Sequence, residues 1–369
     1  MPEQRHLLVV GASGVIGTAA VEHFGRQAGW TVTALSRRAP ITREGTAFTH
    51  IAVDLADAAA CAAAVAALPP VTHLVYAAVK EAPGLAAGWR DEALIAENGR
   101  MFANILDPLA DRGTLAHAIV LQGTKAYGAH RHPVAVPAKE DRPRDDHPNF
   151  YWLHEDHARA KGRQAGFAVT LFRPQILLGT APGAAMNPAA AIGAYAALCH
   201  ATGRPFAFPG DVHAFWEMVD AGLLAEAFGW AFDTPAADGQ TYNITNGDVL
   251  VPAHAWGELA AALGLADGGI AEVRLADVFA APEAVAAWGD LVRDHGLRVG
   301  TLPALLGESH HYVDLLVGPR IGGRPVPVLL STIKLRQAGF AECRDSLDSL
   351  IDNIRAMADL RLLPPFARP

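Results

Sequence analysis

A glycine-rich turn near the start of the chain constrains the fold more than any other feature. The apolar run HLLVVG at residues 6–11 opens directly into GASGVIG at residues 11–17, and the next residues have the apolar spacing of a helix. Glycines in this GxxGxxG pattern permit a tight turn, a close approach of backbone to a pyrophosphate, and close packing of helix on strand. The free N–H groups at the helix start favour phosphate. The turn therefore predicts a dinucleotide site on the first strand of an α/β fold.

The first half of the chain alternates between strands and helices. Further strands are expected from the apolar runs at 30–36, 48–54, 72–78, 117–123 and 167–174. Helices are expected after the glycine turn, at 57–67, at 91–112 and from Phe150, with Asn149 as N-cap. The strand runs are apolar throughout, which is typical of parallel strands buried on both faces. The pattern predicts an α/β fold with a Rossmann-type doubly wound parallel sheet.

Beyond residue 180 the alternation weakens. A strand at 241–245 can still be recognised, with helices around 218–231, 254–264 and 345–358. We expect a Rossmann domain over residues 1–175, with segments near 210–250 returning to it, and a smaller, mostly helical substrate-binding region over most of 176–369. Aromatic residues of this region either line an apolar pocket or pack in the core: Tyr195, Phe206, Phe208, Phe215 and Trp216.

The end of the second strand predicts which cofactor binds. An acidic residue at this point bonds the ribose 2′-hydroxyl of NAD, whereas arginine accommodates the 2′-phosphate of NADP. The strand ends Ser36-Arg37-Arg38, with no carboxylate. A guanidinium is planar and always charged, which suits phosphate. We therefore expect NADPH, although two solvated surface arginines would give the same pattern.

Other strand ends contribute further candidates at the carboxyl edge of the sheet. Asp54 and Leu55 would lie beside the adenine, and Ala77 and Ala78 are small enough to pass under the ribose and phosphates. The full set of candidate cofactor-binding residues is Gly11, Ser13, Gly14, Val15, Ile16, Gly17, Ser36, Arg37, Arg38, Asp54, Leu55, Ala77, Ala78, Gln122, Pro174 and Ile176.

The usual catalytic pair of short-chain reductases, Tyr-x-x-x-Lys on one helix, is broken in this chain. Tyr76 and Lys80 have the spacing, but Tyr76 lies inside an apolar strand, where four residues span about 13 Å. Tyr151 opens the helix after the fifth strand, and Glu155 stands where the lysine belongs. The chain has five lysines, at 80, 125, 139, 161 and 334, and Lys125 follows the fifth strand. A lysine from another element is therefore needed if catalysis is retained.

Two segments resemble a known family of extended short-chain reductases. LQGTKAYG at 121–128 and NFYWLHED at 149–156 are similar to the LQTGxKHY and NFYYxxED motifs of the progesterone 5β-reductase/iridoid synthase-like family. One residue fewer precedes Lys125, and Ala126 and Trp152 depart from the pattern. Similarity extends to Phe172-Arg173-Pro174 with Gly179, Met186-Asn187, Leu330 to Lys334, and Gly339-Phe340, so it spans nearly the whole chain.

The resemblance implies an NADPH-dependent ene-reductase that reduces the C=C bond of enones and enals in the 1,4 sense, with Tyr151 and Lys125 as the catalytic pair. The stretch at 181–185 differs from the usual family loop, which leaves the substrate range open. An NADPH-dependent carbonyl reductase and an epimerase or dehydratase remain alternatives, although both ordinarily use Tyr-x-x-x-Lys. A dinucleotide-sensing regulator is the non-enzyme alternative, and the retention of both Tyr151 and Lys125 weighs against it.

Net charge and composition limit the classes of binding partner that are expected. A net charge of -8 argues against nucleic-acid and membrane-surface partners, so a small-molecule enone or enal is expected, and a homodimer stays open. Three scattered cysteines and an N-terminus without a long apolar run predict a cytoplasmic protein with reduced thiols. His154 and His157 flank two acids without the HExxH spacing, so no metal site is expected.

Overall fold

The computed structural model describes residues 5–82, 88–318 and 328–366, which divide into two compact units. The first unit contains residues 1–175, 221–244 and 328–342. The second contains residues 176–220, 245–327 and 343–369. Each unit is therefore assembled from three separate stretches of chain.

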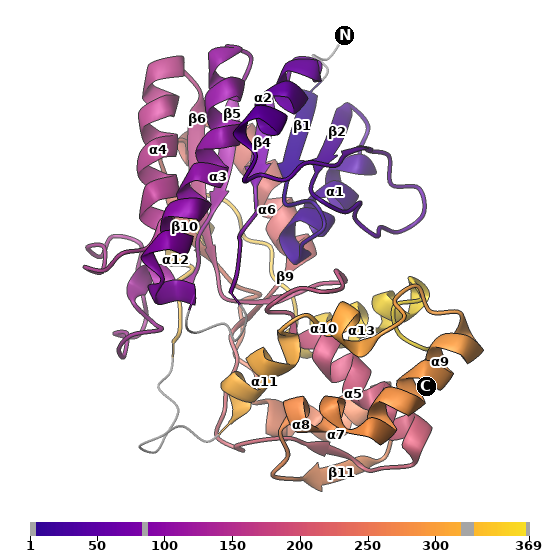
Figure 1. Ribbon diagram of the computed structural model, residues 1–369. Coiled ribbons are helices and arrows are strands. Elements are labelled where there is room, and N and C mark those ends of the chain that lie inside the picture. The colour runs from indigo at the N-terminus through magenta and orange to yellow at the C-terminus, as the bar shows by residue number, and fades with distance from the viewer. Residues whose placement is uncertain (1–4, 83–87, 319–327, 367–369) are drawn as a thin grey trace. The chain divides into compact units, whose positions relative to one another are not determined.

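A seven-stranded sheet forms the centre of the first unit, in the order β10-β6-β5-β4-β1-β2-β3 (Figure 1). Every neighbouring pair in it is parallel. The strands are β1 (Arg5–Val10), β2 (Trp30–Leu35), β3 (Thr49–Ile51), β4 (His73–Tyr76), β5 (His117–Leu121), β6 (Ala168–Pro174) and β10 (Thr241–Ile244). The Rossmann-type sheet expected from the sequence is confirmed.

Helices cover both faces of this sheet (Figure 1). They are α1 (Val15–Gly25), α2 (Ala58–Ala67), α3 (Glu92–Asp111), α4 (Phe150–Ala165) and α6 (Ala221–Asp233), with the short α12 (Ile333–Gln337) beside β10. On one face, side chains of α2, α3 and α4 such as Phe102 and Ala158 form one buried cluster with Leu74 and other strand residues. On the other face, Phe228 of α6 packs on Phe172 of β6, with ring centroids 5.5 Å apart. Burial on both faces explains why the strands are apolar throughout.

Polar caps mark where the helices of this unit begin. The side chain of Asp57 accepts a hydrogen bond from the backbone N–H of Ala60, and Asp91 caps α3 in the same way. The Asn149 side chain accepts a bond of 3.0 Å from the backbone N–H of Tyr151, which confirms the expected cap of α4. The helix expected at 218–231 begins later, because residues 218–220 form strand β9 of the second unit.

The strand order creates a switch point in the first unit. From β1 the chain extends to β2 and β3 on one side, and then returns to place β4, β5, β6 and β10 on the other. Connections from the carboxyl ends of β1 and β4 therefore diverge, and in open α/β sheets ligands bind in the crevice this leaves. The glycine turn follows β1, so it lies at this edge.

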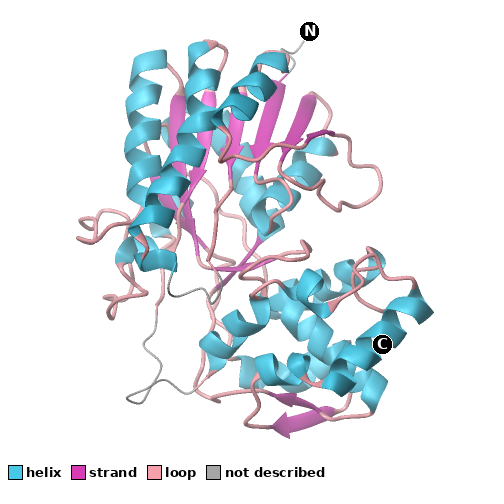
Figure 2. Ribbon diagram, in the orientation of Figure 1, coloured by secondary structure: helices cyan, strands magenta, loops and turns pink. Residues whose placement is uncertain are grey.

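The second unit is mostly helical (Figure 2). Its helices are α5 (Pro188–Thr202), α7 (Pro252–Ala262), α8 (Leu275–Ala280), α9 (Pro282–His295), α10 (Leu302–Leu306), α11 (Ser309–Val317) and α13 (Ser346–Asp359). Two pairs of short parallel strands join them, β7 (Ile176–Leu178) with β9 (Met218–Asp220) and β8 (Phe206–Phe208) with β11 (Asp267–Ile270). Helix α5 is buried on nearly every side, which fits its run of alanines and other apolar residues. Within the described ranges of the chain, no helix has both the length and the apolar character needed to cross a membrane.

Candidate active site

Two glycines of the first turn are required by packing. Gly11 has φ of +81°, and a Cβ there would lie 2.7 Å from the backbone nitrogen of Ala78. A Cβ on Gly17 would collide with the carbonyl oxygen of Gly11 and lie 2.7 Å from the Cα of Ala12. The turn, the end of β4 and the first turn of α1 therefore approach one another as closely as backbone allows.

Gly14 is different, because it faces open space. It is the N-cap of α1, and a Cβ on it would meet only the carbonyl oxygen of Gly11, at 3.4 Å. Among the residues that the structure describes, no side chain caps this helix start, and the first turn of α1 carries no acidic residue. Uncapped N–H groups next to an open cradle fit the phosphates of a dinucleotide. Ser13 and Ile16 beside it are half-buried, whereas Val15 is buried.

The end of β2 presents two exposed arginines. Ser36 turns the chain there, and its hydroxyl donates a 2.7 Å hydrogen bond to the carbonyl oxygen of Arg38. The side chains of Arg37 and Arg38 are exposed, and neither guanidinium has a hydrogen bond or ion pair within the part of the chain that the structure describes. Both cations are therefore available for an anion.

The other predicted strand ends lie at the same edge. Asp54 is exposed, and its carboxylate accepts a 3.0 Å bond from the backbone N–H of Ala56. Leu55 is buried against the core of the unit. Ala77 and Ala78 follow β4, where Ala77 is half-buried and its N–H donates to the carbonyl oxygen of Val10. The backbone of Ala77 and Ala78 is what a Cβ on Gly11 would meet, so Gly11 packs directly on this strand end.

Gln122 has a structural role that the sequence did not reveal. Its Nε2 donates to Glu155 Oε2 at 3.0 Å and to the carbonyl oxygen of Tyr151 at 3.3 Å, and its Oε1 accepts from Arg173 Nε at 2.7 Å. Both amide hydrogens have partners in the protein, so the side chain ties β5 to α4 and β6 rather than pointing a donor at a cofactor. Pro174 ends β6 in the first unit, and Ile176 begins β7 in the second.

Tyr151 and Lys125, the predicted catalytic pair, lie on different elements and both contact Trp89. Tyr151 lies in the first turn of α4, and a Cβ on Gly123 would lie 3.2 Å from its hydroxyl oxygen, so the phenol occupies the carboxyl end of β5. Lys125 lies on a 3-10 helix (Thr124–Tyr127), with Nζ 3.8 Å from the centre of the Trp89 ring. That ring lies 5.3 Å from the Tyr151 ring. The pair is therefore brought together without the Tyr-x-x-x-Lys spacing.

Trp89 is a site residue that sequence reasoning missed. It lies on a 3-10 helix (Gly88–Arg90), in a connection without a recognisable motif. It is buried, it packs against Phe150 at 4.8 Å, and its indole N–H donates a 3.1 Å bond to Glu81. A large aromatic residue in the loop after the fourth strand was the only sequence feature that could have indicated it.

Burial sets the electrostatics around Lys125. It lowers the pKa of the ammonium to about 8, although the nearby Glu81 carboxylate acts in the opposite direction. Burial also raises the pKa of Glu81, while the charge of Lys125 and the hydrogen bond from Trp89 act to lower it. The Asn149 side chain, which caps α4, also donates a 3.2 Å bond to the carbonyl oxygen of Lys125. The lysine segment and the start of the tyrosine helix are therefore joined.

Glu155 occupies the helical position at which the Tyr-x-x-x-Lys pattern has lysine. It is buried and accepts hydrogen bonds from Gln122 at 3.0 Å and from Arg159 at 3.0 Å, and Arg144 lies 3.2 Å away. Burial raises its pKa, but these three partners outweigh burial and the pKa is lowered. Glu155 is thus a partnered structural carboxylate.

Other candidates from the sequence are structural. Tyr76 is buried in β4, where burial raises its pKa, and Lys80 forms an ion pair with Glu97 at 2.6 Å. His154 bonds the carbonyl oxygen of Asn98 at 3.0 Å, whereas His157 pairs with Asp107 at 2.7 Å. The two histidines therefore turn to different partners.

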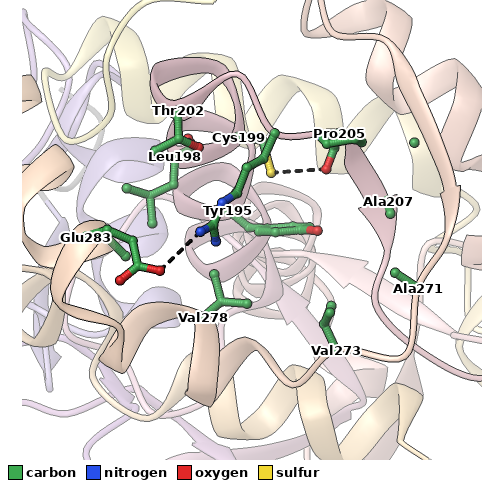
Figure 3. A pocket seen from close by; sticks show the side chains of 13 residues that line it. Tyr195, Leu198, Cys199, Thr202, Pro205, Ala207, Ala271, Val273, Val278 and Glu283 are labelled. Carbon is green, nitrogen blue, oxygen red and sulfur yellow. Dashed lines mark hydrogen bonds and ion pairs between the residues drawn. The ribbon is translucent and has the colours of Figure 1, made fainter.

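An apolar pocket lies within the second unit, with a volume of about 290 Å³ (Figure 3). Tyr195 and Leu198 of α5 and Val278 of α8 project into it, and Arg204 pairs with Glu283 at 3.1 Å. Among the aromatics considered from the sequence, Tyr195 lines this pocket. The others are largely core residues, since Phe206, Phe208 and Trp216 are buried and Phe206 stacks on Trp256.

A doubly wound parallel sheet with an open glycine cradle at its switch point defines a dinucleotide-binding protein of the short-chain dehydrogenase/reductase type. Residues 7–245 match the model of the NAD dependent epimerase/dehydratase family, and the chain belongs to that family. It is therefore a member of an NAD-dependent family within the short-chain dehydrogenase/reductase superfamily.

Curated relatives agree with the resemblance in the motifs. The chain is 29% identical to (S)-8-oxocitronellyl enol synthase of Antirrhinum majus, over 97% of this chain and 92% of that one. It is 30% identical to (S)-8-oxocitronellyl enol synthase ISY2 of Nepeta cataria, over 79% and 76%. It is 26% identical to 3-oxo-Delta(4,5)-steroid 5-beta-reductase of Arabidopsis thaliana, over 97% and 92%. The membership in the progesterone 5β-reductase/iridoid synthase-like group is confirmed.

Solved structures share the fold. UDP-glucose 4-epimerase of Thermus thermophilus, in complex with NAD, superimposes with a TM-score of 0.64 at 21% identity, covering 95% of this chain and 99% of that one. The Bordetella bronchiseptica enzyme WbmH, in complex with NAD+, gives a TM-score of 0.66 at 15% identity, covering 97% and 100%.

Proposed function

We propose that this protein is an NADPH-dependent ene-reductase that saturates the activated C=C bond of a small enone or enal. The proposal rests on the arrangement of Tyr151 and Lys125, which both contact the indole ring of Trp89. Glu155 stands at the helical position of the usual lysine, so Lys125 is supplied by another element. The names of the relatives, an enol synthase and a steroid 5-beta-reductase, support the same class of reaction.

The missing Tyr-x-x-x-Lys pair fits 1,4-reduction better than alcohol oxidation. NADPH, when bound, supplies a hydride to the β-carbon of the enone. Negative charge then develops on the carbonyl oxygen, and a donor aimed at that oxygen stabilises the transition state. Tyr151 can donate from its neutral phenol, so it needs no adjacent lysine to ionise it. Lys125, as a cation beside Trp89, adds positive potential to the same region. The enolate then takes a proton at its α-carbon from solvent water, and a saturated carbonyl compound leaves.

The cofactor preference rests on the end of β2. Arg37 and Arg38 are exposed and stand where an NAD-preferring protein has a carboxylate. The residues that would hold the dinucleotide are the glycine turn, the start of α1 and these two arginines. NADPH is therefore the proposed cofactor.

Product analysis tests the proposal. The purified protein is incubated with NADPH and a panel of small enones, enals and steroid enones, and products are identified by mass spectrometry and NMR. A saturated ketone or aldehyde is expected. An allylic alcohol would instead identify a carbonyl reductase, and the absence of NADPH consumption across the panel would contradict the ene-reductase assignment.

A further inference from the structure

A second pocket, of about 380 Å³, lies within the first unit. It is lined by Trp89, Arg90, His130, Arg131, His147 and Pro148. Trp89 also contacts both Lys125 and Tyr151, so the pocket shares a wall with the proposed catalytic pair. Nothing in the proposed chemistry uses its basic residues.

Two guanidinium groups of this pocket have no counter-charge among the described residues. Arg90 and Arg131 are exposed, and in the described part of the chain neither side chain has a hydrogen bond or ion pair. They belong to different segments, the 3-10 helix at 88–90 and the loop after Tyr127. Two unpaired guanidinium groups brought to one pocket by separate segments form a positive site.

The imidazole ring of His130, which lines the pocket, has unused hydrogen-bonding capacity. Both of its ring nitrogens are buried, and neither has a hydrogen-bond partner among the described residues. Buried polar atoms in proteins nearly always have a partner. Burial, together with the positive charges of His147, Lys125, Arg131 and Arg90, lowers the pKa of His130 to about 4. The neutral ring can donate one N–H to an anion held by the arginines.

Two carboxylates near this pocket, those of Asp145 and Glu81, are already engaged. Asp145 lies 2.6 Å from His147 Nδ1 and 2.5 Å from His132 Nε2. Glu81 accepts the indole N–H of Trp89 and faces Lys125. These two carboxylates are therefore paired with groups other than the two arginines and His130.

We propose that this pocket binds a carboxylate carried by the substrate, so that the enzyme acts on enones with an acidic side arm. A guanidinium fork matches a carboxylate, and the flat Trp89 and Pro148 surfaces suit the organic part of such a molecule. The assignment of substrate class rests on the proposed ene-reductase function, whereas the carboxylate site itself does not.

Binding without turnover tests the site directly. Calorimetry on the NADP+-loaded protein compares 4-oxopentanoate, its methyl ester and inorganic phosphate. The acid should bind about tenfold more tightly than the ester, since only the acid pairs with the arginines. Equal binding of acid and ester would overturn the proposal, and tighter binding of phosphate than of the acid would overturn the assignment to a carboxylate.

Variants locate the site. Arg90→Gln and Arg131→Gln should each weaken binding of the acid about three- to tenfold and leave binding of the ester unchanged. Arg163→Gln removes the same charge from the last turn of α4, the opposite end of the helix from Tyr151, and should change neither. Unchanged affinity for the acid in Arg90→Gln and Arg131→Gln would exclude this pocket.

Kinetics separates the site from the reaction. With 4-oxopent-2-enoate and its methyl ester as substrates, the acid should have the lower KM, and Arg131→Gln should raise that KM with little change in kcat. Reduction of both substrates at equal KM would contradict the carboxylate site but not the ene-reductase function. Selective binding of 4-oxopentanoate by a protein that reduces no enone would support the carboxylate site and contradict the ene-reductase function.

Discussion

Tyr151 and Lys125 make separable contributions, because they belong to different elements. Replacing Tyr151 by phenylalanine removes one hydroxyl from the carboxyl end of β5 and keeps the ring packed on Trp89. We expect turnover of an enone to fall about a hundredfold or more, the usual effect of losing an oxyanion donor, with NADPH affinity nearly intact. Steady-state kinetics and calorimetry measure the two quantities.

Tyr127→Phe is the matched control for that change. Its hydroxyl donates to Asn243 at 2.7 Å, so its loss should reduce stability and spare turnover. Full activity in Tyr151→Phe would remove this tyrosine as the essential donor.

Lys125 predicts a pH dependence with a definite sign. Its pKa in the folded protein is about 8, lowered by burial from 10.5. If the cation assists the reaction, kcat/KM is highest below pH 8 and falls as the pH rises through that value. The folded state binds this proton less tightly than the unfolded state, so this group makes stability rise between about pH 8 and 10.5. A pH–rate profile measures the first effect.

Lys125→Arg provides the control for the pH profile, since arginine keeps its charge far above pH 8. The basic limb of the profile should then move to higher pH. An unchanged limb in Lys125→Arg would assign it to another group.

At the scale of the element, the start of α1 distinguishes a binding glycine from a packing glycine. A valine at Gly14 would place its side chain in the open cradle, where the nearest neighbour of Cβ is the carbonyl oxygen of Gly11 at 3.4 Å. We expect loss of NADPH binding with the fold retained, as measured by calorimetry and circular dichroism. Gly17→Val should instead disrupt folding, because its Cβ collides with backbone. Unchanged NADPH affinity in Gly14→Val would place the cofactor elsewhere.

The end of β2 carries the cofactor preference. Charge-assisted bonds to a 2′-phosphate are worth about 1.5–3 kcal/mol, and the exposure of Arg37 and Arg38 favours the lower value, so NADPH should bind about tenfold more tightly than NADH. Arg37→Ala combined with Arg38→Ala should remove that preference. Arg26→Ala, an exposed arginine at the end of α1, should not. Equal dissociation constants for the two cofactors in the unaltered protein would contradict the assignment.

At the scale of the whole molecule, the first unit is assembled from three chain segments, and Asn243 links them. Its side chain is fully buried, donates to the carbonyl oxygens of Ala138 and Ser331, and accepts from Tyr127 at 2.7 Å. Asn243→Ala removes all three of these hydrogen bonds, although the carbonyl oxygen of Ala138 keeps the N–H of Ser331. The loss should lower the free energy of unfolding by about 2–4 kcal/mol. Urea unfolding, with amide exchange in β6 and β10 as a local probe, measures the change.

Asn104→Ala is the comparison for that prediction, because its half-exposed side chain donates a single bond of 2.9 Å to Leu55. Its loss should cost under about 1 kcal/mol. Similar losses in the two variants would contradict the linking role of Asn243.

The sequence alone determined the features that depend on neighbouring residues. Strands β1, β2, β4, β5 and β6 follow from apolar runs, because a strand buried on both faces needs apolar residues. The glycine turn follows from backbone sterics, and the start of α4 follows from the Asn149 cap. The fold class was therefore predictable from the sequence.

Only the tertiary structure decided which distant residues meet. Trp89 joins Tyr151 and Lys125 from a loop without a motif, and Gln122 proved to be engaged with Glu155 and Arg173. His130 and the two arginines beside it converge on one pocket from separate loops. Such contacts depend on how the loops after β4 and β5 fold over the sheet edge, and long-range packing, unlike local spacing, has no period in the sequence.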